Sequence, residues 1–329
     1  MLTFRDRLTD SRPIIHDGGF GSELFRRGVV LMNSSLASES HPDAVVDVHR
    51  TYLEAGSESI TTNTFVVSSL HLDMAGKDSA EAEKLAALAA RQARQAGEEV
   101  GSEAYVAGSI GPSPGAIEAD GGTDFGIENE KVREAHRRVM GALADEGVDY
   151  LCIETMFSAK EAAIAVDEAR RSGLPIAVNM TFKSTKDRKT GEIIYRTDWG
   201  HGPGDLLDYL AEGEFSSGEN LIDSVAVFGA NCGAEARDAA HTGMPYAQEA
   251  MLQCQAALDS RGITGKRLMA YPNAGLPQLI KGETVYSQTA EEMAEGIGDV
   301  LDAGTLILGG CCGTGPDHIR RFKDVVDNR

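Results

Sequence analysis

The sequence lacks any apolar run long enough to cross a bilayer, and its first residues, MLTFRDRLTDSRP, carry scattered charges and no apolar signal core. We therefore expect a cytoplasmic protein without a membrane partner. Basic residues are also in deficit, with 31 Lys and Arg against 51 Asp and Glu and a formal net charge of −20. Because such a surface repels nucleic acid and anionic lipid, we do not expect nucleic acid as a partner either.

Cysteine is scarce and odd in number. The five cysteines are Cys152, Cys232, Cys254, Cys311 and Cys312. In a chain without a secretion signal, this argues against a disulfide framework and favours free or metal-bound thiols. Two of the five are adjacent in LILGGCCGTG (306–315), with glycines on both sides. Adjacent cysteines suit an ordinary intramolecular disulfide poorly, so the pair indicates another use for two thiols.

The chain does contain a regular alternation of β-rich runs and helical patterns. Apolar residues recur at helical spacing between the runs, as in Val45, Val48, Tyr52 and Leu53. The runs themselves are almost continuously apolar, as expected for parallel strands covered on both faces. Eight strands are predicted, over residues 13–19, 58–65, 104–112, 149–156, 175–182, 224–232, 267–275 and 305–313.

Eight strand–helix units in series predict an α/β fold, a (β/α)8 TIM barrel formed as a single domain by residues 1–329. A doubly wound open sheet is the structural rival, but no GxGxxG motif follows the first strand. Two segments, 183–203 and 212–223, exceed ordinary loop length, and loops this long are often lids or binding elements.

In a TIM barrel the chemistry lies at the carboxyl ends of the strands. The predicted strands place Asp17, Asn63, Glu154, Cys232, Cys311 and Cys312 at or near such ends. Three cysteines from two strands then meet at one rim, and three thiolates suit a catalytic zinc ion with its fourth position open. Gly309, Gly310 and Gly313 would let the backbone turn sharply beside it.

The alternative interpretation, if each thiol is considered singly, is that the cysteine is a small hydrophobic residue buried in the core. We apply that interpretation to Cys152, inside the fourth strand, and to Cys254, on a helix.

The motifs DGGFGSELFRRG, TNTF, GANC and GGCCGTGPDHI, in this order, resemble those of the homocysteine S-methyltransferases. The similarity runs from about Ile14 to Phe322, and TNTF and YPNAGLP are closest to the homocysteine domain of cobalamin-dependent methionine synthase. The resemblance implies that Cys232, Cys311 and Cys312 hold Zn²⁺, with the homocysteine sulfur in the fourth position. It implies methyl transfer to that sulfur, giving methionine, with no catalytic residue beyond the zinc site.

The resemblance also implies contacts to the polar end of homocysteine. Glu154 and Asp17 match positions that face this end, and an anionic pair suits an ammonium group. Backbone amides around Gly18 and Gly19 are candidates to receive the carboxylate. The structural alternatives are that Asp17 caps a turn and that Glu154 pairs with an arginine. Asn231 is expected to order the strand end rather than touch substrate.

The methyl donor stays open among a sulfonium, a methylated amine and a separate methyl-corrinoid protein. The cobalamin signature DxHxxG is absent, since DVHRTY at 47–52 has Tyr52 where glycine is required. A quaternary ammonium donor needs aromatic faces. Val66 stands where the betaine enzymes have an aromatic residue, and the only tryptophan, Trp199, lies in the segment 183–203. Tyr195, Trp199 and His201 are candidates for a donor lid or for packed anchors of that loop.

Two functions outside methyl transfer remain as alternatives. Cys311 and Cys312 could act as a redox-active dithiol or form a vicinal disulfide without zinc. The barrel could also be a zinc-binding protein without catalysis.

Overall fold

Eight parallel strands form one sheet in the computed structural model, which describes residues 2–121, 126–216, 218–233, 239–280 and 283–329. Each strand lies within its predicted range, so the eight predicted strands are confirmed. In sheet order they are β1 (Ile14–Ile15), β12 (Thr305–Leu308), β9 (Arg267–Pro272), β8 (Val227–Cys232), β5 (Ile176–Met180), β4 (Tyr150–Met156), β3 (Tyr105–Ile110) and β2 (Ser59–Thr61).

The sheet closes on itself between β1 and β2. His16 and Ser59 form a parallel bridge there, and the Glu58 N–H donates to the Ile15 carbonyl at 2.7 Å. On the other side of β1, the His16 N–H donates to the Leu308 carbonyl of β12 at 2.8 Å. The closed, all-parallel sheet confirms the TIM barrel and rules out the doubly wound rival.

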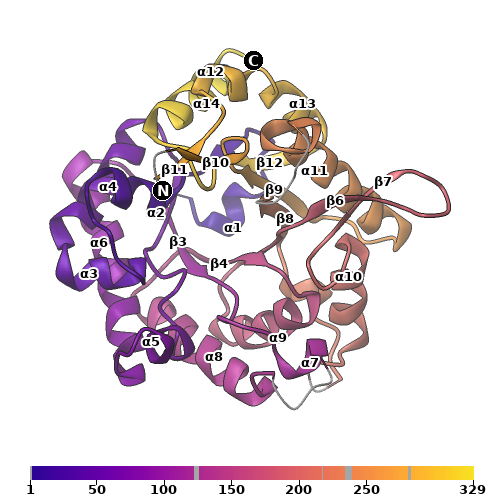
Figure 1. Cartoon of the computed structure of the whole chain (residues 1–329), viewed down its shortest axis with the longest axis horizontal. Helices are drawn as coiled ribbons and strands as arrows, with labels where there is room; N and C mark the ends of the chain where they lie inside the picture. Colours follow the sequence, from indigo (N-terminus) through magenta and orange to yellow (C-terminus); the bar gives the residue numbers. More distant parts are fainter. Residues whose placement is uncertain (1, 122–125, 217, 234–238, 281–282) are drawn as a thin grey trace.

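Helices form a ring around the strands, and the short helix α1 (Phe4–Arg7) lies inside the ring (Figure 1). Burial of Val45, Val48, Tyr52 and Leu53 follows the predicted apolar face of α4. The larger helices of the ring are α4 (Pro42–Glu54), α6 (Ala82–Val100), α8 (Asn129–Asp145), α9 (Ala159–Ala169), α10 (Pro203–Glu212), α11 (Gly243–Ser260) and α14 (Pro316–Asp327). Shorter ones are α2 (Phe20–Arg26), α3 (Ala37–Ser40), α5 (Ser69–Met74), α7 (Glu118–Gly121), α12 (Ala290–Ala294) and α13 (Ile297–Asp302).

The interior of the barrel is packed at its amino-terminal end. Phe4 of α1 stacks on Tyr150 with ring centroids 3.9 Å apart, and both side chains belong to a buried cluster with Ile14, Met269 and Ile307. This packing leaves the carboxyl-terminal end of the barrel as the place for a site.

The long segment 183–203 forms an antiparallel hairpin, β6 (Lys183–Lys186) with β7 (Ile193–Arg196), which extends sideways from the barrel in Figure 1. Tyr195 is an anchor of the hairpin, because its buried ring stacks on Tyr246 and its hydroxyl lies 3.1 Å from His241 Nδ1. His201 Nδ1 accepts the first-turn N–H of Ala159 in α9. Tyr195 and His201 therefore hold the loop in place, and Trp199 is the most exposed of the three, at 42%.

The other long segment, 212–223, precedes β8 and so joins the barrel at the end opposite the carboxyl termini of the strands. A second hairpin, β10 (Pro277–Ile280) with β11 (Glu283–Tyr286), follows β9 at the carboxyl-terminal rim.

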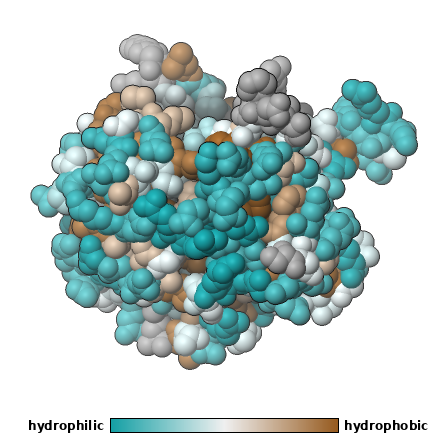
Figure 2. All heavy atoms as spheres, turned by 90° about the horizontal axis from the view of Figure 1, so that it is seen from below, coloured by the Kyte–Doolittle hydropathy of each residue, from teal (hydrophilic) through white to brown (hydrophobic). Residues whose placement is uncertain are grey.

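The face of the molecule shown in Figure 2 is mostly hydrophilic, in keeping with the excess of acidic residues. Among the described helices, none has the length and apolar character needed to span a membrane.

Candidate active site

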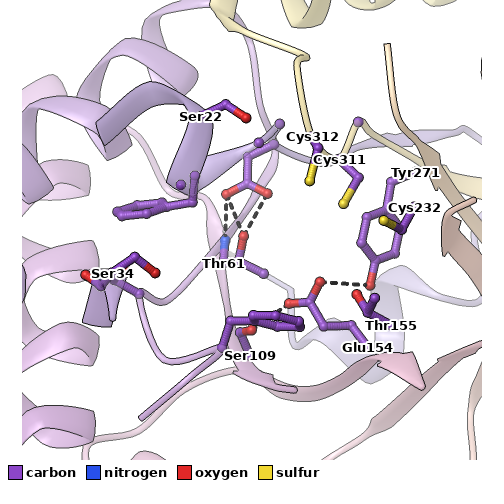
Figure 3. Close-up of a pocket in the computed structure, with 18 of the residues that line it drawn as sticks. Ser22, Ser34, Thr61, Ser109, Glu154, Thr155, Cys232, Tyr271, Cys311 and Cys312 are labelled. Carbon is purple, nitrogen blue, oxygen red and sulfur yellow. Dashed lines mark hydrogen bonds between the residues drawn. The ribbon is translucent and has the colours of Figure 1, made fainter. Parts of the chain in front are cut away.

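A cavity of about 450 Å³ opens at the carboxyl ends of the strands (Figure 3). Its inner wall carries sulfur, carboxylate and hydroxyl groups, and its outer wall carries Phe20, Phe65, Phe157 and His71. Among the described residues that line it, none is a lysine or an arginine. The cavity therefore has an acidic and thiol-rich inner end and a more apolar mouth.

Three thiols meet at the inner end, from Cys232, Cys311 and Cys312. Their sulfur atoms all lie within 4.8 Å of one another, and Figure 3 shows them turned toward the same space. Cys232 ends β8, whereas Cys311 and Cys312 lie in the loop after β12, three and four residues beyond the strand end at Leu308. The structure thus brings together the three cysteines that the sequence predicted to converge.

The end of β9 holds both cysteine segments, because β9 lies between β8 and β12 in the sheet. The Cys311 N–H donates to the Pro272 carbonyl at 2.8 Å, and the Cys312 N–H donates to Asn273 Oδ1 at 3.0 Å. On the other side, the Asn273 N–H donates to the Cys232 carbonyl at 3.1 Å. These three bonds hold the backbone of the two cysteine segments together at the rim.

Of the glycines around the pair, Gly313 has the left-handed φ of +83° that the sequence led us to expect. A Cβ at Gly313 would also lie 2.3 Å from the Tyr286 ring. Gly309 has another reason to be glycine, since its Cβ would lie 2.7 Å from the Asp17 carbonyl. Close packing of the cysteine loop, rather than a sharp turn, explains why residue 309 is a glycine.

The thiols influence one another's ionisation. Hydrogen bonds from Cys232 and Cys311 hold the pKa of the Cys312 thiol well below its usual value, whereas hydrogen bonding to Cys232 and Cys312 raises the pKa of Cys311. Three thiolates this close repel one another unless a cation lies between them. Tetrahedral zinc holds sulfur ligands at about 2.3 Å, which places them roughly 3.8 Å apart. The donor set therefore fits a thiophilic divalent metal ion.

Asp17 and Glu154 are buried on the wall next to the thiols. Both Asp17 carboxylate oxygens accept from Thr61, at 2.7 Å from its N–H and 2.8 Å from its hydroxyl. Glu154, in β4, accepts from the Ser109 hydroxyl and, at 3.4 Å, from Tyr271 (Figure 3). Burial raises the pKa of Glu154 to about 7 and also raises that of Asp17.

These partners decide against both structural alternatives. The described residues give Glu154 hydroxyl partners rather than an arginine, and Asp17 bonds across the barrel seam to Thr61 rather than to its own turn. Two buried carboxylates therefore face the cavity without a lysine or arginine beside them. A cationic group on a ligand would complete the site.

Gly18 and Gly19 also line the cavity, but the Gly19 N–H already donates to the Thr314 carbonyl at 2.9 Å and to its hydroxyl at 3.2 Å. A Cβ at Gly19 would lie 2.6 Å from the Cys311 carbonyl. Gly19 is therefore needed for packing of the first loop against the cysteine loop. The prediction that an amide here receives a carboxylate stands only for Gly18.

Asn231 has the ordering role that the sequence predicted. Its side chain accepts from the Thr155 N–H at 2.8 Å and donates to the Thr155 hydroxyl at 2.7 Å. Thr155 and Cys232 are the only described non-glycine residues with positive φ, at 58° and 61°. Both adjoin the cavity, and such conformations persist where surrounding contacts fix them.

The sequence reasoning missed several residues of the site, among them Thr61, Ser109, Tyr271, His16 and His71. Ser109 is a polar residue inside an otherwise apolar strand, and this feature of the sequence could have identified it as a site residue. Cys152 and Cys254 are both buried away from the thiol cluster, in agreement with the packing role predicted for them.

The comparisons with known proteins agree with this geometry. The family model described as homocysteine S-methyltransferase matches residues 14–326. Methionine synthase of Mycobacterium tuberculosis is 26% identical over 337 residues, which cover 96% of this chain and 25% of that protein. Methionine synthase of Mycobacterium leprae is also 26% identical, over 96% of this chain and 24% of its own length. The chain thus spans about a quarter of each of these relatives.

A crystal structure of the homocysteine methyltransferase MmuM from Escherichia coli, in its metallated form, has the same fold. It superposes with a TM-score of 0.70 at 23% identity, over 97% of this chain and 98% of that one.

Proposed function

This chain belongs to the homocysteine S-methyltransferase family, and we propose that it transfers a methyl group from a donor to the thiol of homocysteine, giving methionine. The observation that carries the proposal is one cavity in which three converging thiols face two buried carboxylates, with no lysine or arginine among the described residues that line it. Homocysteine matches this arrangement, because it has a thiol at one end and an ammonium group at the other.

The proposed cofactor is one Zn²⁺ held by Cys232, Cys311 and Cys312. A free thiol has a pKa of about 8.5 and is mostly protonated at neutral pH, whereas the thiolate is the nucleophile. Bound at these cysteines, zinc would supply the positive charge that keeps an incoming thiol deprotonated. Hydrogen bonds to Pro272 and Asn273 at the end of β9 support the backbone of all three cysteines.

The proposed contacts for the acceptor are Asp17 and Glu154 to the ammonium group and the Gly18 N–H to the carboxylate. Thr61 holds Asp17, and Ser109 and Tyr271 hold Glu154, so both carboxylates are oriented before the ligand binds. Orientation by bonds already formed reduces the entropy cost of binding. The wall on this side of the cavity therefore acts as an ammonium receptor.

The proposed donor is a small organic cation, a sulfonium or a methylated amine. Phe65 and Phe157 are partly exposed at the mouth, and a second cavity of about 410 Å³ shares Phe157 with the first. Asp120, Glu161, Asp198 and Trp199 line that second cavity, and no lysine or arginine does so among the described residues. Asp198 is paired with Lys183, which is outside the lining, so Asp120 and Glu161, together with the aromatic rings, are the groups that suit a cation.

The test is incubation of the zinc-loaded protein with homocysteine and one donor at a time, with methionine measured by mass spectrometry. The donors are S-methylmethionine, glycine betaine and a methyl-corrinoid protein. Methionine from either cation supports the whole proposal. Methionine from the corrinoid protein alone supports methyl transfer and rejects the cationic donor, and methionine from none rejects the function.

Substitution of Trp199 by alanine is expected to raise the KM for the donor roughly two- to fivefold, the value of one exposed cation–π contact. Homocysteine binding should change little, because its proposed contacts lie at the inner end of the cavity. Trp199 is 42% exposed, so its removal leaves no large void and should lower the melting temperature only slightly.

The matched control is Leu252→Ala, which removes a similarly exposed apolar side chain from α11, away from both cavities. A loss of stability in the Trp199 variant with unchanged donor kinetics would show that Trp199 only anchors its loop.

A further inference from the structure

A chain of buried polar side chains lies under Asp17, at the seam where the barrel closes. Ser59 Oγ lies 2.9 Å from the Tyr150 hydroxyl and 3.1 Å from His16 Nδ1. The other ring nitrogen, His16 Nε2, lies 3.4 Å from Asp17 Oδ1 and has no hydrogen-bond partner. His16 is 1% exposed, and both His16 and Asp17 line the cavity.

The charge on Asp17 determines where the proton on His16 lies. If Nδ1 carried it, the Nε2 lone pair would face a carboxylate at 3.4 Å in a buried, low-dielectric place. With the proton on Nε2, the positive end of the N–H dipole lies 3.4 Å from Asp17 Oδ1, which is a favourable electrostatic contact, and Nδ1 accepts from Ser59. Ser59 Oγ then accepts from Tyr150. Only this direction gives Ser59, Tyr150 and His16 Nδ1 their hydrogen bonds and at the same time places a hydrogen rather than a lone pair beside the Asp17 carboxylate.

Within the part of the chain that the structure describes, Asp17 is the one charged group that acts appreciably on His16. Tyr271 meets its ring edge-on with centroids 5.5 Å apart, and its hydroxyl is directed to Glu154 and Cys152. Burial lowers the pKa of His16, so the ring meets Asp17 with the dipole of a neutral N–H rather than with a positive charge.

We propose that His16 is a positioning residue for acceptor binding, whose Nε2–H, directed by Tyr150 and Ser59, keeps the Asp17 carboxylate ionised and turned toward the ammonium group of the acceptor. This rests on the proposed function, in which Asp17 contacts homocysteine. Asp17 would then have two hydrogen-bond donors, the Thr61 N–H and hydroxyl, and the His16 N–H as a further electrostatic contact. Because His16 acts through Asp17, its effect is confined to ligands that carry an ammonium group.

The test compares homocysteine with 4-mercaptobutanoic acid, which has the same thiol and carboxylate but no amino group. Binding of each to the zinc-loaded protein is measured by calorimetry. His16→Leu should weaken homocysteine binding roughly three- to tenfold, because the buried Asp17 carboxylate loses a polar contact of about the net strength of one neutral hydrogen bond. Binding of 4-mercaptobutanoic acid and the zinc content should stay unchanged.

Three further variants separate positioning from structural damage. His16→Gln places an amide N–H near the former Nε2 and should recover most of the affinity. Ser59→Ala keeps His16 and should give a smaller loss in the same direction, which tests the proposal even if His16→Leu does not fold. In an Asp17→Asn background, His16→Leu should add no further loss, because its partner charge is gone.

Equal weakening of both ligands, or unchanged homocysteine binding in His16→Leu and Ser59→Ala, would overturn the proposal. These outcomes are distinct from failure of the proposed function, which appears as absence of methionine from the unmodified protein with every donor.

Discussion

Replacement of Cys312 by serine is expected to remove bound zinc and methyl transfer together. Serine keeps a similar volume, but its hydroxyl does not ionise at neutral pH, and two thiolates remain. Across the described residues, the metal-ligating groups gathered at this site are the three cysteines alone, so none is available to replace the lost sulfur. Loss of a ligand should cost more than the roughly 10- to 100-fold in metal affinity typical of losing an outer-shell partner.

The control is Cys254→Ser, which changes a cysteine buried in α11 outside the thiol cluster. It should retain one zinc per chain and full activity, with only a modest loss of stability. Zinc is measured by mass spectrometry of the purified proteins. Full zinc occupancy in the Cys312 variant would defeat the assignment. Absence of zinc from the unmodified protein, with thiols that cycle under mild oxidant, would favour the redox-active dithiol.

Glu154→Gln is expected to weaken homocysteine binding by roughly five- to 150-fold, corresponding to about 1–3 kcal/mol, with the zinc content unchanged. The amide is nearly isosteric with the carboxylate and keeps an oxygen for the Ser109 hydroxyl, but it carries no charge for the ammonium group. Calorimetric titration measures the affinity. Unaltered affinity would return Glu154 to a purely structural role.

The pH dependence of the same two proteins gives a second readout. Burial raises the pKa of Glu154 to about 7, so the fraction of charged carboxylate grows as pH rises from 6 to 8. Affinity for the ammonium form of homocysteine should grow with it, in addition to the gain from easier loss of the thiol proton. The Gln variant retains only the second effect. The affinity of the unmodified protein divided by that of the Gln variant should therefore increase with pH. A constant ratio would contradict the assigned role.

The barrel and the convergence of the cysteines could be predicted because both follow from the order of the elements. Almost continuous apolar runs identify parallel strands, and parallel strands bring their carboxyl ends to one rim. Strand ends were predicted less well. Cys311 and Cys312 were assigned to the end of the eighth strand, but the strand ends at Leu308. Glycine-rich sequence has no periodicity, so the sequence does not mark where pairing stops.

Contacts between distant segments could not be predicted from one sequence. The donation from the Gly19 N–H to Thr314 joins residues 295 positions apart, and the bond from Tyr271 to Glu154 spans 117. Tyr195 looked like a possible lid residue because its loop is long, and its burial against Tyr246 depends on how the hairpin packs on α11. The burial and the contacts of such side chains depend on tertiary packing rather than on the local sequence pattern.

The central claim is most directly tested by methionine formation in the zinc-loaded protein, supplied with homocysteine and each methyl donor in turn. We predict that methionine accumulates with a sulfonium or methylated amine, that homocysteine is consumed in equal amount, and that removal of zinc by a chelator stops the reaction. A folded protein with one zinc per chain that forms no methionine with either cation or with a methyl-corrinoid protein would contradict the account.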